Sequence, residues 1–341
     1  MATAKKLPSG TWRVLVSTGV KNEKGKYIYK SFTAKSKREC EALAAQYLAE
    51  NNNPNADSIG KSIDKYINLK APVLSPSTVA GYRRIWRTIN ANSKWFYDLK
   101  ADKLTEVLFQ KFINELSMNH KPKTVANYHG LIVSALKVEK VNVPHVNLPA
   151  KIHYNGYLPT DADIKRLFDL LKGSELEIIV LLGVLGPMRR GEIRALEMSD
   201  IDGNVVHVCR AYVEDDNYDE VSKGPKTYDS DRYIEYPPYV IDRIREQGYI
   251  CNMSLRMISK RFNYFLHKNG FTHFRFHDLR HYGASILHAI GMPDSYIMER
   301  GGWKTDNVMK NVYRHTISEE TKKFNEKANE HFKSFLDGED K

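Results

Sequence analysis

The sequence has few cysteines and no long apolar run, and each absence excludes a class of protein. Its three cysteines, Cys40, Cys209 and Cys251, are odd in number and far apart. This spacing excludes a disulfide framework and a cysteine-based zinc site, and it fits a reducing cytoplasm. The longest apolar run covers the eight residues Ile178 to Leu185, whereas a membrane-spanning helix needs about 20. We therefore expect a cytoplasmic protein with no membrane span.

Charge is distributed unevenly along the 341 residues. The chain carries 52 basic and 41 acidic side chains, a formal net charge of +11. Residues 1–50 hold 10 basic against 4 acidic side chains and residues 56–145 hold 14 against 7, whereas residues 146–341 hold 28 against 30. A basic front part joined to a near-neutral rear part suggests a polyanion-binding region linked to a region with another task.

Hydrophobic patterning separates three regions. Alternation predicts strands at Thr11–Ser17 and Tyr27–Phe32, and a capping box of Ser36 and Glu39 starts a helix after them. The next region shows apolar residues three and four positions apart, which is typical of helices, and the rear region mixes helices with short strands. The predicted fold class is mainly α with small β-sheets. The predicted domains are residues 1–55, 56–148 and 149–341.

The same patterns predict the individual elements. In the middle region one helix includes Ile63 and Ile67, Ser77 caps a second, and two more are predicted at Thr105–Leu116 and Thr124–Val138. The predicted helices of the rear region are Asp161–Leu171, Glu175–Leu185, Arg190–Met198, Pro238–Gln247, Leu255–Lys268, His277–Ile290, Pro293–Arg300, Asn307–Tyr313 and Glu319–Phe335. Its predicted antiparallel strands are Val205–Val213, Tyr218–Lys223 and Arg232–Tyr236.

Four short motifs in the rear region carry chemically capable side chains. They are Arg189 with Glu192 in RRGE, Lys226 in KTYDSDR, His277 with Arg280 in HDLR, and Gly302-Trp303 followed ten residues later by Tyr313 in GGWKTDNVMKNVY. Each motif alone has a simple structural explanation, as a surface arginine, a hairpin lysine, a chance His-x-x-Arg or a core tyrosine. Their joint occurrence in this order and spacing favours a shared functional site.

In that order and spacing the motifs resemble those of the tyrosine recombinases, the family of phage and conjugative-transposon integrases. The flanking text GPMRRGEIRALEMSDID and HDLRHYGAS resembles the family as well, and the resemblance extends over the whole chain, most specifically over residues 157–315. It implies a sheet-plus-helix domain that binds arm-type DNA sites, a helical SAM-like domain that binds core sites, and a mixed α/β catalytic domain. It also implies a site-specific recombinase that integrates or excises a mobile element without metal or ATP.

The catalytic residues that the resemblance implies are Arg189, Lys226, His277, Arg280, Trp303 and the nucleophile Tyr313. Cleaving a phosphodiester without a metal requires fixed cations around its non-bridging oxygens. Arg189 and Arg280 suit this task, because arginine is always charged and forks onto phosphate oxygens. His277, one helical turn before Arg280, projects from the same helix face. Trp303, where other family members carry histidine, supplies an N–H donor and a packing surface.

The phenol of Tyr313 needs help to lose its proton, because the ordinary pKa of tyrosine is about 10. Nearby cations would lower that pKa, and His277 is the expected proton acceptor. Attack gives a 3′-phosphotyrosine and a free 5′-hydroxyl, whose oxygen Lys226 would protonate. Glu192 is expected to orient its neighbours rather than to react.

His277 and His281 stand four residues apart in HDLRH, a spacing that also suits zinc. No third ligand is convincing, and Arg280 beside them would repel a divalent cation. We therefore predict no metal and no cofactor, and we expect His281 to be a supporting or packing histidine.

Basic and aromatic side chains interleave in the middle region. The predicted DNA contacts there are Arg83, Arg84, Arg87, Lys121 and Lys123. The three arginines can share one helix face opposite Ile85 and Ile89, which would separate a phosphate side from a core side. A solvated charged face explains the same pattern.

The predicted last helix, Glu319–Phe335, places Phe324, Ala328, Phe332 and Phe335 at helical spacing. The resemblance implies that this tail packs on a neighbouring protomer, and packing within its own chain explains the pattern too. The expected partners are double-stranded DNA at core-type and arm-type sites, further copies of the chain in a homotetramer on DNA, and an excisionase or DNA-bending accessory protein.

Three other functions are compatible with parts of the sequence. A type IB topoisomerase shares the cleavage chemistry but needs no second duplex, and the two N-terminal DNA modules argue against it. A non-catalytic DNA-binding protein would have lost part of the residue set, which is complete here. A metal-dependent nuclease would use the histidine pair and would be inhibited by EDTA.

Overall fold

The computed structural model describes residues 3–21, 26–51, 56–151, 156–224 and 231–305, together with residue 329. The chain divides into a first compact unit of residues 1–74 and 81–152 and a second of residues 75–80 and 153–341. The first two predicted domains therefore share one unit, and the three-domain division remains a prediction. No described helix is both long and apolar enough to cross a membrane. The predicted elements outside the described residues are the helices Asn307–Tyr313 and Glu319–Phe335.

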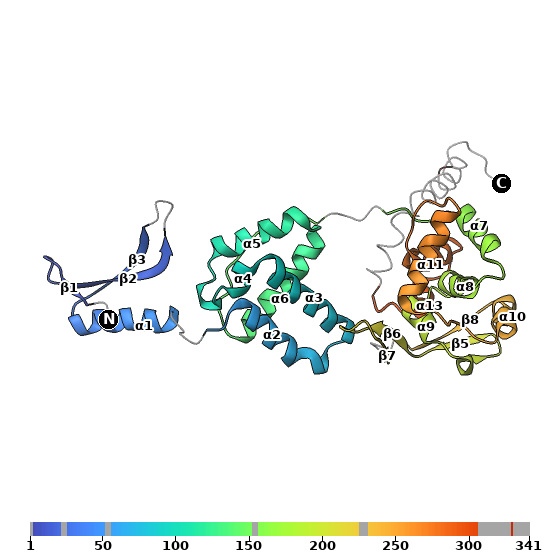
Figure 1. Ribbon diagram of the computed structural model, residues 1–341, viewed down its shortest axis with the longest axis horizontal. Helices are drawn as coiled ribbons and strands as arrows, with labels where there is room; N and C mark the ends of the chain where they lie inside the picture. Colours follow the sequence, from blue (N-terminus) through green and yellow to red (C-terminus); the bar gives the residue numbers. More distant parts are fainter. Residues whose placement is uncertain are drawn as a thin grey trace, which may run out of the picture. The chain divides into compact units, whose positions relative to one another are not determined.

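A small sheet and one helix begin the first unit. Their bounds are Lys5–Lys6 for β1, Trp12–Lys21 for β2, Tyr27–Ala34 for β3 and Lys37–Asn51 for α1. The strands pair antiparallel in chain order, and α1 lies along one face of the sheet (Figure 1). Val14 and Val16 are buried in a core that includes Cys40 of α1. Of the predicted capping box, the structure shows the Ser36 hydroxyl accepting from the backbone N–H of Glu39 at 3.2 Å.

The elements between residues 59 and 138 are helical, as predicted for this region. The helices are α2 (Ile59–Lys70), α3 (Pro76–Asn92), α4 (Lys94–Asp98), α5 (Glu106–Asn119) and α6 (Pro122–Val138), with 3-10 turns at Ala71–Val73 and Ala101–Lys103. The core between them is aromatic, with the rings of Phe96 and Phe112 stacked at 3.8 Å between centroids. Thr105 caps α5 by accepting a hydrogen bond from the backbone N–H of Leu108.

One predicted helix start in this region is wrong. Helix α3 begins at Pro76, so Ser77 lies inside its first turn and is not its cap. Proline suits the first helical position because its fixed φ is already helical and its missing N–H would have no partner there. The short helix α4 was not predicted, since five residues give too little periodicity to detect.

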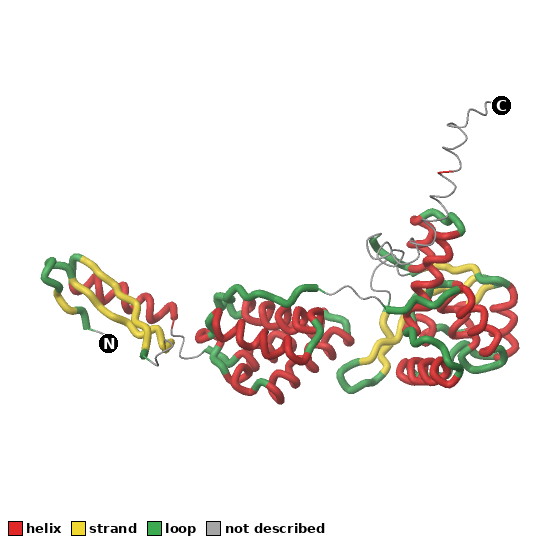
Figure 2. The backbone as a smooth tube through the Cα atoms, turned by 90° about the horizontal axis from the view of Figure 1, so that it is seen from above, coloured by secondary structure: helices red, strands yellow, loops and turns green. Residues whose placement is uncertain are grey.

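The second unit packs helices around short strands (Figure 2). Its elements are α7 (Asp161–Leu171), α8 (Glu177–Leu185), α9 (Arg190–Ala195), β4 (Ile201–Asp202), β5 (Val205–Val208), β6 (Ala211–Glu214), β7 (Glu220–Lys223), β8 (Arg232–Glu235), α10 (Pro238–Gln247), α11 (Leu255–Lys268), α12 (Phe276–Ala289) and α13 (Asp294–Gly301), with a 3-10 turn at Met198–Asp200. The bounds predicted for α7, α10 and α11 are confirmed.

The strand predicted at Val205–Val213 is two strands in two sheets. β5 pairs with β4 and β8, whereas β6 pairs only with β7 among the described strands. The chain changes partners at Cys209–Arg210, where the Arg210 guanidinium donates to both carboxylate oxygens of Asp200. The prediction was wrong because the alternation of side chains continues through a change of pairing partner.

Helix α8 forms the centre of the second unit's core. Ile178, Ile179 and Leu182 have no exposed surface, and α7, α9, α10 and α12 all pack against this helix. Gly283 lets α12 approach α8 closely, because a Cβ there would lie 2.0 Å from the carbonyl oxygen of Val184. This close contact fixes the helix that carries HDLR against the helix that precedes RRGE.

Candidate active site

Arg189 lies immediately before α9, where the chain leaves α8. Its backbone N–H donates to Glu192 Oε2 at 2.8 Å. Its guanidinium donates to Glu192 Oε1 at 2.6 Å and to the carbonyl of Gly302 at 2.9 Å. Because 40% of the side chain remains exposed, the held guanidinium still presents an edge to which an anion can bind.

Arg280 is almost completely buried, with 1% of its surface exposed. Its Nη1 donates to the carbonyls of Pro187 and, at 2.7 Å, of Gly301. Its Nη2 has no hydrogen-bond partner among the described residues. Burial, followed by repulsion from Arg189, lowers the pKa of Arg280. A buried guanidinium with an unfilled donor is suited to receive an anionic oxygen.

The turn Gly301-Gly302-Trp303 ends α13 and brings backbone carbonyls to both arginines. Gly302 adopts the left-handed conformation, with φ +65°, that favours glycine. A Cβ on Gly301 would lie 1.8 Å from the Trp303 ring, so this position also needs glycine. Trp303 is buried, and the Arg280 guanidinium lies 3.8 Å from its ring centroid in a cation–π contact. The indole is therefore a packing wall of the site.

Glu192 is a buried carboxylate between two arginines. Besides its contacts to Arg189, its Oε2 accepts from Arg232 Nη2 at 2.8 Å. Desolvation disfavours its charge, but attraction to Arg232, then to Arg189 and Arg280, lowers the pKa of Glu192 to about 2. The carboxylate is therefore ionised at neutral pH, and its contacts are those of a residue that orients Arg189.

Arg232 was missed by the sequence reasoning. In β8 it takes the same inward-facing register as Ile234, and only 2% of its side chain is exposed. A charged residue at an apolar position of a strand was the available signal, because such a charge is costly unless it is paired.

His277 and His281 lie one turn apart on α12, with their ring centroids at 4.6 Å and the rings edge to face. His277 keeps part of its surface open to solvent. Desolvation, followed by repulsion from His281 and Arg280, lowers the pKa of His277 to about 4. The imidazole is therefore neutral at pH 7 and able to accept a proton. Desolvation also lowers the pKa of His281.

Arg189, Arg280 and Trp303 thus meet at one turn, and His277 lies one helical turn before Arg280. Lys226 and Tyr313, the other two predicted catalytic residues, lie outside the described residues. No group of three His, Cys, Asp or Glu side chains that could hold a metal ion occurs within the described ranges.

The predicted DNA contacts of the first unit have different surroundings. Arg84, Arg87, Lys121 and Lys123 are exposed. Arg83 has only 22% of its side chain exposed and donates to Asp64 and Asn68 of α2. Arg83 therefore ties α3 to α2, and the phosphate contacts of the three arginines stay a prediction.

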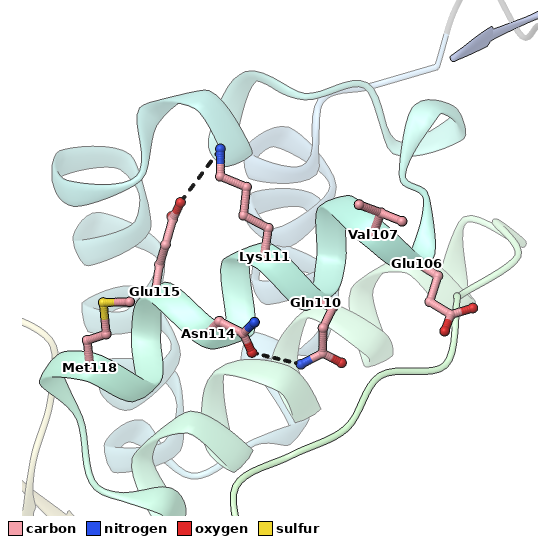
Figure 3. Close-up of a pocket in the computed structure, with 7 residues that line it drawn as sticks. All are labelled: Glu106, Val107, Gln110, Lys111, Asn114, Glu115 and Met118. Atoms are coloured by element: carbon pink, nitrogen blue, oxygen red, sulfur yellow. Dashed lines mark hydrogen bonds and ion pairs between the residues drawn. The ribbon is translucent and has the colours of Figure 1, made fainter. Parts of the chain in front are cut away.

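A surface hollow of about 610 Å³ lies along α5 in the first unit (Figure 3). Its lining residues are Glu106, Val107, Gln110, Lys111, Asn114, Glu115 and Met118. Its polar side chains pair along the helix, Lys111 with Glu115 and Gln110 with Asn114. Because its lining holds no histidine or cysteine, we assign the hollow no chemistry.

Known proteins resemble this chain in sequence and in fold. The model of the phage integrase family matches residues 244–320. A curated tyrosine recombinase XerC-like protein of Caldanaerobacter subterraneus subsp. tengcongensis is 24% identical over 364 residues, covering 90% of this chain and 92% of the relative.

Solved structures of integrases share the fold. The Tn1549 transposon integrase, in complex with transposon right end DNA, superposes with a TM-score of 0.63 at 14% identity, covering 76% of this chain and 95% of that one. A lambda integrase tetramer bound to a Holliday junction gives 0.58 at 16% identity, covering 91% and 94%.

The fold and the arginine-lined site, taken with these matches, define an enzyme that breaks and rejoins DNA strands. These matches support a tyrosine recombinase, and residues 244–320 are the part of the chain that matches the phage integrase family.

Proposed function

We propose that this chain is a site-specific recombinase that integrates or excises a mobile element through a 3′-phosphotyrosine intermediate. The observation that carries the proposal is the seating of Arg189 and Arg280 on the carbonyls of Gly302 and Gly301, beside Trp303. Two guanidinium groups fixed in this way suit the non-bridging oxygens of one phosphate and the charge that develops on them. The similarity to transposon and phage integrases bound to DNA supports the same class of substrate.

In the proposed reaction, the phenol oxygen of Tyr313 bonds to phosphorus while the bond from phosphorus to the 5′-oxygen breaks. The phenol proton passes to the neutral imidazole of His277, and Lys226 protonates the departing 5′-oxygen. The phosphodiester is retained as phosphotyrosine. A 5′-hydroxyl of a second duplex then attacks it and regenerates the tyrosine, so the exchange consumes no ATP.

The basic front of the chain supplies the grip on DNA. In the proposed arrangement, residues 1–55 bind arm-type sites, residues 56–148 bind core sites and residues 149–341 catalyse the reaction. A homotetramer would hold two duplexes, as supported by the lambda integrase tetramer on a Holliday junction. An excisionase or a DNA-bending protein would set the direction of exchange, and the enzyme would act in the cytoplasm.

The proposal is tested with a core-site duplex that carries a nick close to the cleavage site. Cleavage then releases a short fragment that bears the free 5′-hydroxyl. Because this fragment diffuses away, the covalent intermediate cannot be religated and accumulates. We expect a protein–DNA adduct, seen as a band of retarded mobility in a denaturing gel, that forms equally with and without EDTA. Relaxation of a supercoiled plasmid without any joining of two duplexes would contradict recombination and would indicate a topoisomerase. Loss of cleavage in EDTA would indicate a metal-dependent nuclease.

The Lys121 and Lys123 pair is expected to contribute to DNA affinity through phosphate contacts. The double variant Lys121→Ala/Lys123→Ala should lower the slope of log affinity against log salt by about 0.9 for each lost contact. Fluorescence anisotropy with labelled core-site DNA at several salt concentrations measures this slope. Lys111→Ala is the matched control, since Lys111 pairs with Glu115 and should leave the slope unchanged. An equal effect of both variants would refute these phosphate contacts.

A further inference from the structure

Arg232 joins parts of the second unit that are distant in sequence. It begins β8, and its Nε donates to the carbonyl of Arg300, at the end of α13, at 2.8 Å. Its Nη2 donates to Glu192 of α9 at 2.8 Å, and Nη1 lies 3.4 Å from the other oxygen of the same carboxylate. With 2% of its side chain exposed, Arg232 has no open edge toward a DNA substrate.

Three successive carbonyls at the end of α13 each accept a hydrogen bond from one arginine. Arg300 accepts from Arg232, Gly301 from Arg280, and Gly302 from Arg189. The last carbonyls of a helix have no partner within it and lie at the negative end of its dipole, so they favour cations. Arg232 therefore donates to the first of these three carbonyls. The other two accept from Arg280 and Arg189, the arginines assigned to phosphate.

Arg232 also fixes Arg189 from the opposite side. Glu192, which Arg232 pairs with, accepts from both the backbone and the guanidinium of Arg189. These contacts run from the carbonyl of Arg300 through Arg232, Glu192 and Arg189 to the carbonyl of Gly302. The backbone from Arg300 to Gly302 closes them into a ring. A shift of Arg232 would move Arg189 and the glycine turn together.

We propose that Arg232 is a positioning residue of the recombination reaction, which holds Arg189 and the Gly301-Gly302-Trp303 turn in the arrangement that binds the scissile phosphate. The reaction in this proposal rests on the proposed function. The arrangement of Arg189 and the glycine turn can be probed separately, with any tetrahedral anion. Arginine suits the task because one planar fork reaches a carboxylate and a carbonyl at once, whereas lysine offers a single point charge.

The first test compares Arg232→Met and Arg232→Lys with wild type on the nicked core-site duplex, at saturating DNA and in single turnover. For Arg232→Met we expect a cleavage rate about 10²-fold lower, the cost of misplacing a reacting group by about 1 Å, with DNA affinity little changed. Arg232→Lys should recover part of the rate. A variant that cleaves at the wild-type rate would overturn the proposal.

The pH profile separates positioning from mere stability. Without the charge of Arg232, the buried Glu192 retains Arg189 of α9 and Arg280 of α12 as neighbouring cations, and its pKa rises. As the pH falls through this raised pKa, the protonated carboxyl holds Arg189 less well. We expect the ratio of variant to wild-type rate to fall as pH falls. His277 and His281 are present in the variant and in wild type, so the effect of their titration on the rate cancels in that ratio. A flat ratio would therefore contradict the proposal.

A matched control and an anion probe complete the design. Arg243→Met removes an arginine from Glu177, another buried carboxylate of the second unit, and should lower the melting temperature without changing cleavage. Replacing chloride by sulfate at constant ionic strength should raise the melting temperature of wild type and Arg243→Met more than that of Arg232→Met. If wild type forms no adduct while these sulfate effects appear, the proposed function fails and the positioning role stands. If Arg232→Met does not fold, Arg232→Lys and its pH profile decide.

Discussion

Replacing Tyr313 by phenylalanine is expected to abolish the covalent protein–DNA adduct. In the proposed reaction the phenol oxygen bonds to phosphorus, and a phenyl ring offers no nucleophile in its place. Loss of a covalent nucleophile lowers the rate of the chemical step on the order of 10⁶-fold in other enzymes, which is below detection in a gel assay. The measurement is the trapped adduct on the nicked core-site duplex.

Tyr228→Phe is the matched control for this experiment. Tyr228 lies two residues after Lys226 and, like Tyr313, outside the described residues, so both expectations come from the motif spacing. We expect the Tyr228→Phe enzyme to form the adduct and both variants to bind core-site DNA as wild type does. An adduct that survives in Tyr313→Phe, with the linkage mapped to another residue, would refute the assignment of the nucleophile.

Replacing Arg280 by lysine should lower the cleavage rate on the order of 10³-fold, the effect of losing a fixed donor or an arginine that stabilises a transition state. Lysine keeps the positive charge, but it cannot donate to Pro187 and Gly301 while also meeting a phosphate oxygen. It also loses the flat contact with the Trp303 ring. The rate is measured in single turnover at saturating DNA.

The same substitution is expected to cost stability, and the two effects can be told apart. Each buried carbonyl left without its donor destabilises the fold by about 1–3 kcal/mol, which a melting curve detects. The rate should therefore be measured well below the melting temperature of the Arg280→Lys enzyme. A folded variant that cleaves within about tenfold of wild type would show that Arg280 has mainly a structural role.

Much of the second unit was predictable because its signals are local. Helices α7, α10 and α11 combine apolar periodicity with a clear start or stop, such as Thr160 before α7 and Gly248 after α10. These signals depend on residues within a few positions of each other, and so they can be read without knowing the fold. The division of β5 from β6 could not be read in this way, since pairing partners are set by distant residues.

The site shows the same contrast. Arg189 and Arg280 could be predicted as phosphate-binding residues from their motifs, because fixed residue types at fixed spacing indicate the chemistry. That Arg280 would be almost completely buried, donating to two carbonyls behind an indole, could not be predicted, because those contacts come from 93 residues before it and 21 after it. Arg232 belongs to no local motif, and it becomes visible only once Glu192 and the end of α13 are placed around it.

The row of carbonyls at the end of α13 has a consequence for the evolution of this enzyme. A backbone oxygen is present whatever side chain its residue carries, so substitutions can accumulate around the row without removing an acceptor. Within the row the two glycines are constrained, one by its left-handed backbone and one by the neighbouring indole, and Arg300 is held by its own hydrogen bonds to the carbonyls of Leu185 and Glu235. Diverging relatives could therefore exchange side chains around this row while the backbone acceptors that hold the three arginines stay in place.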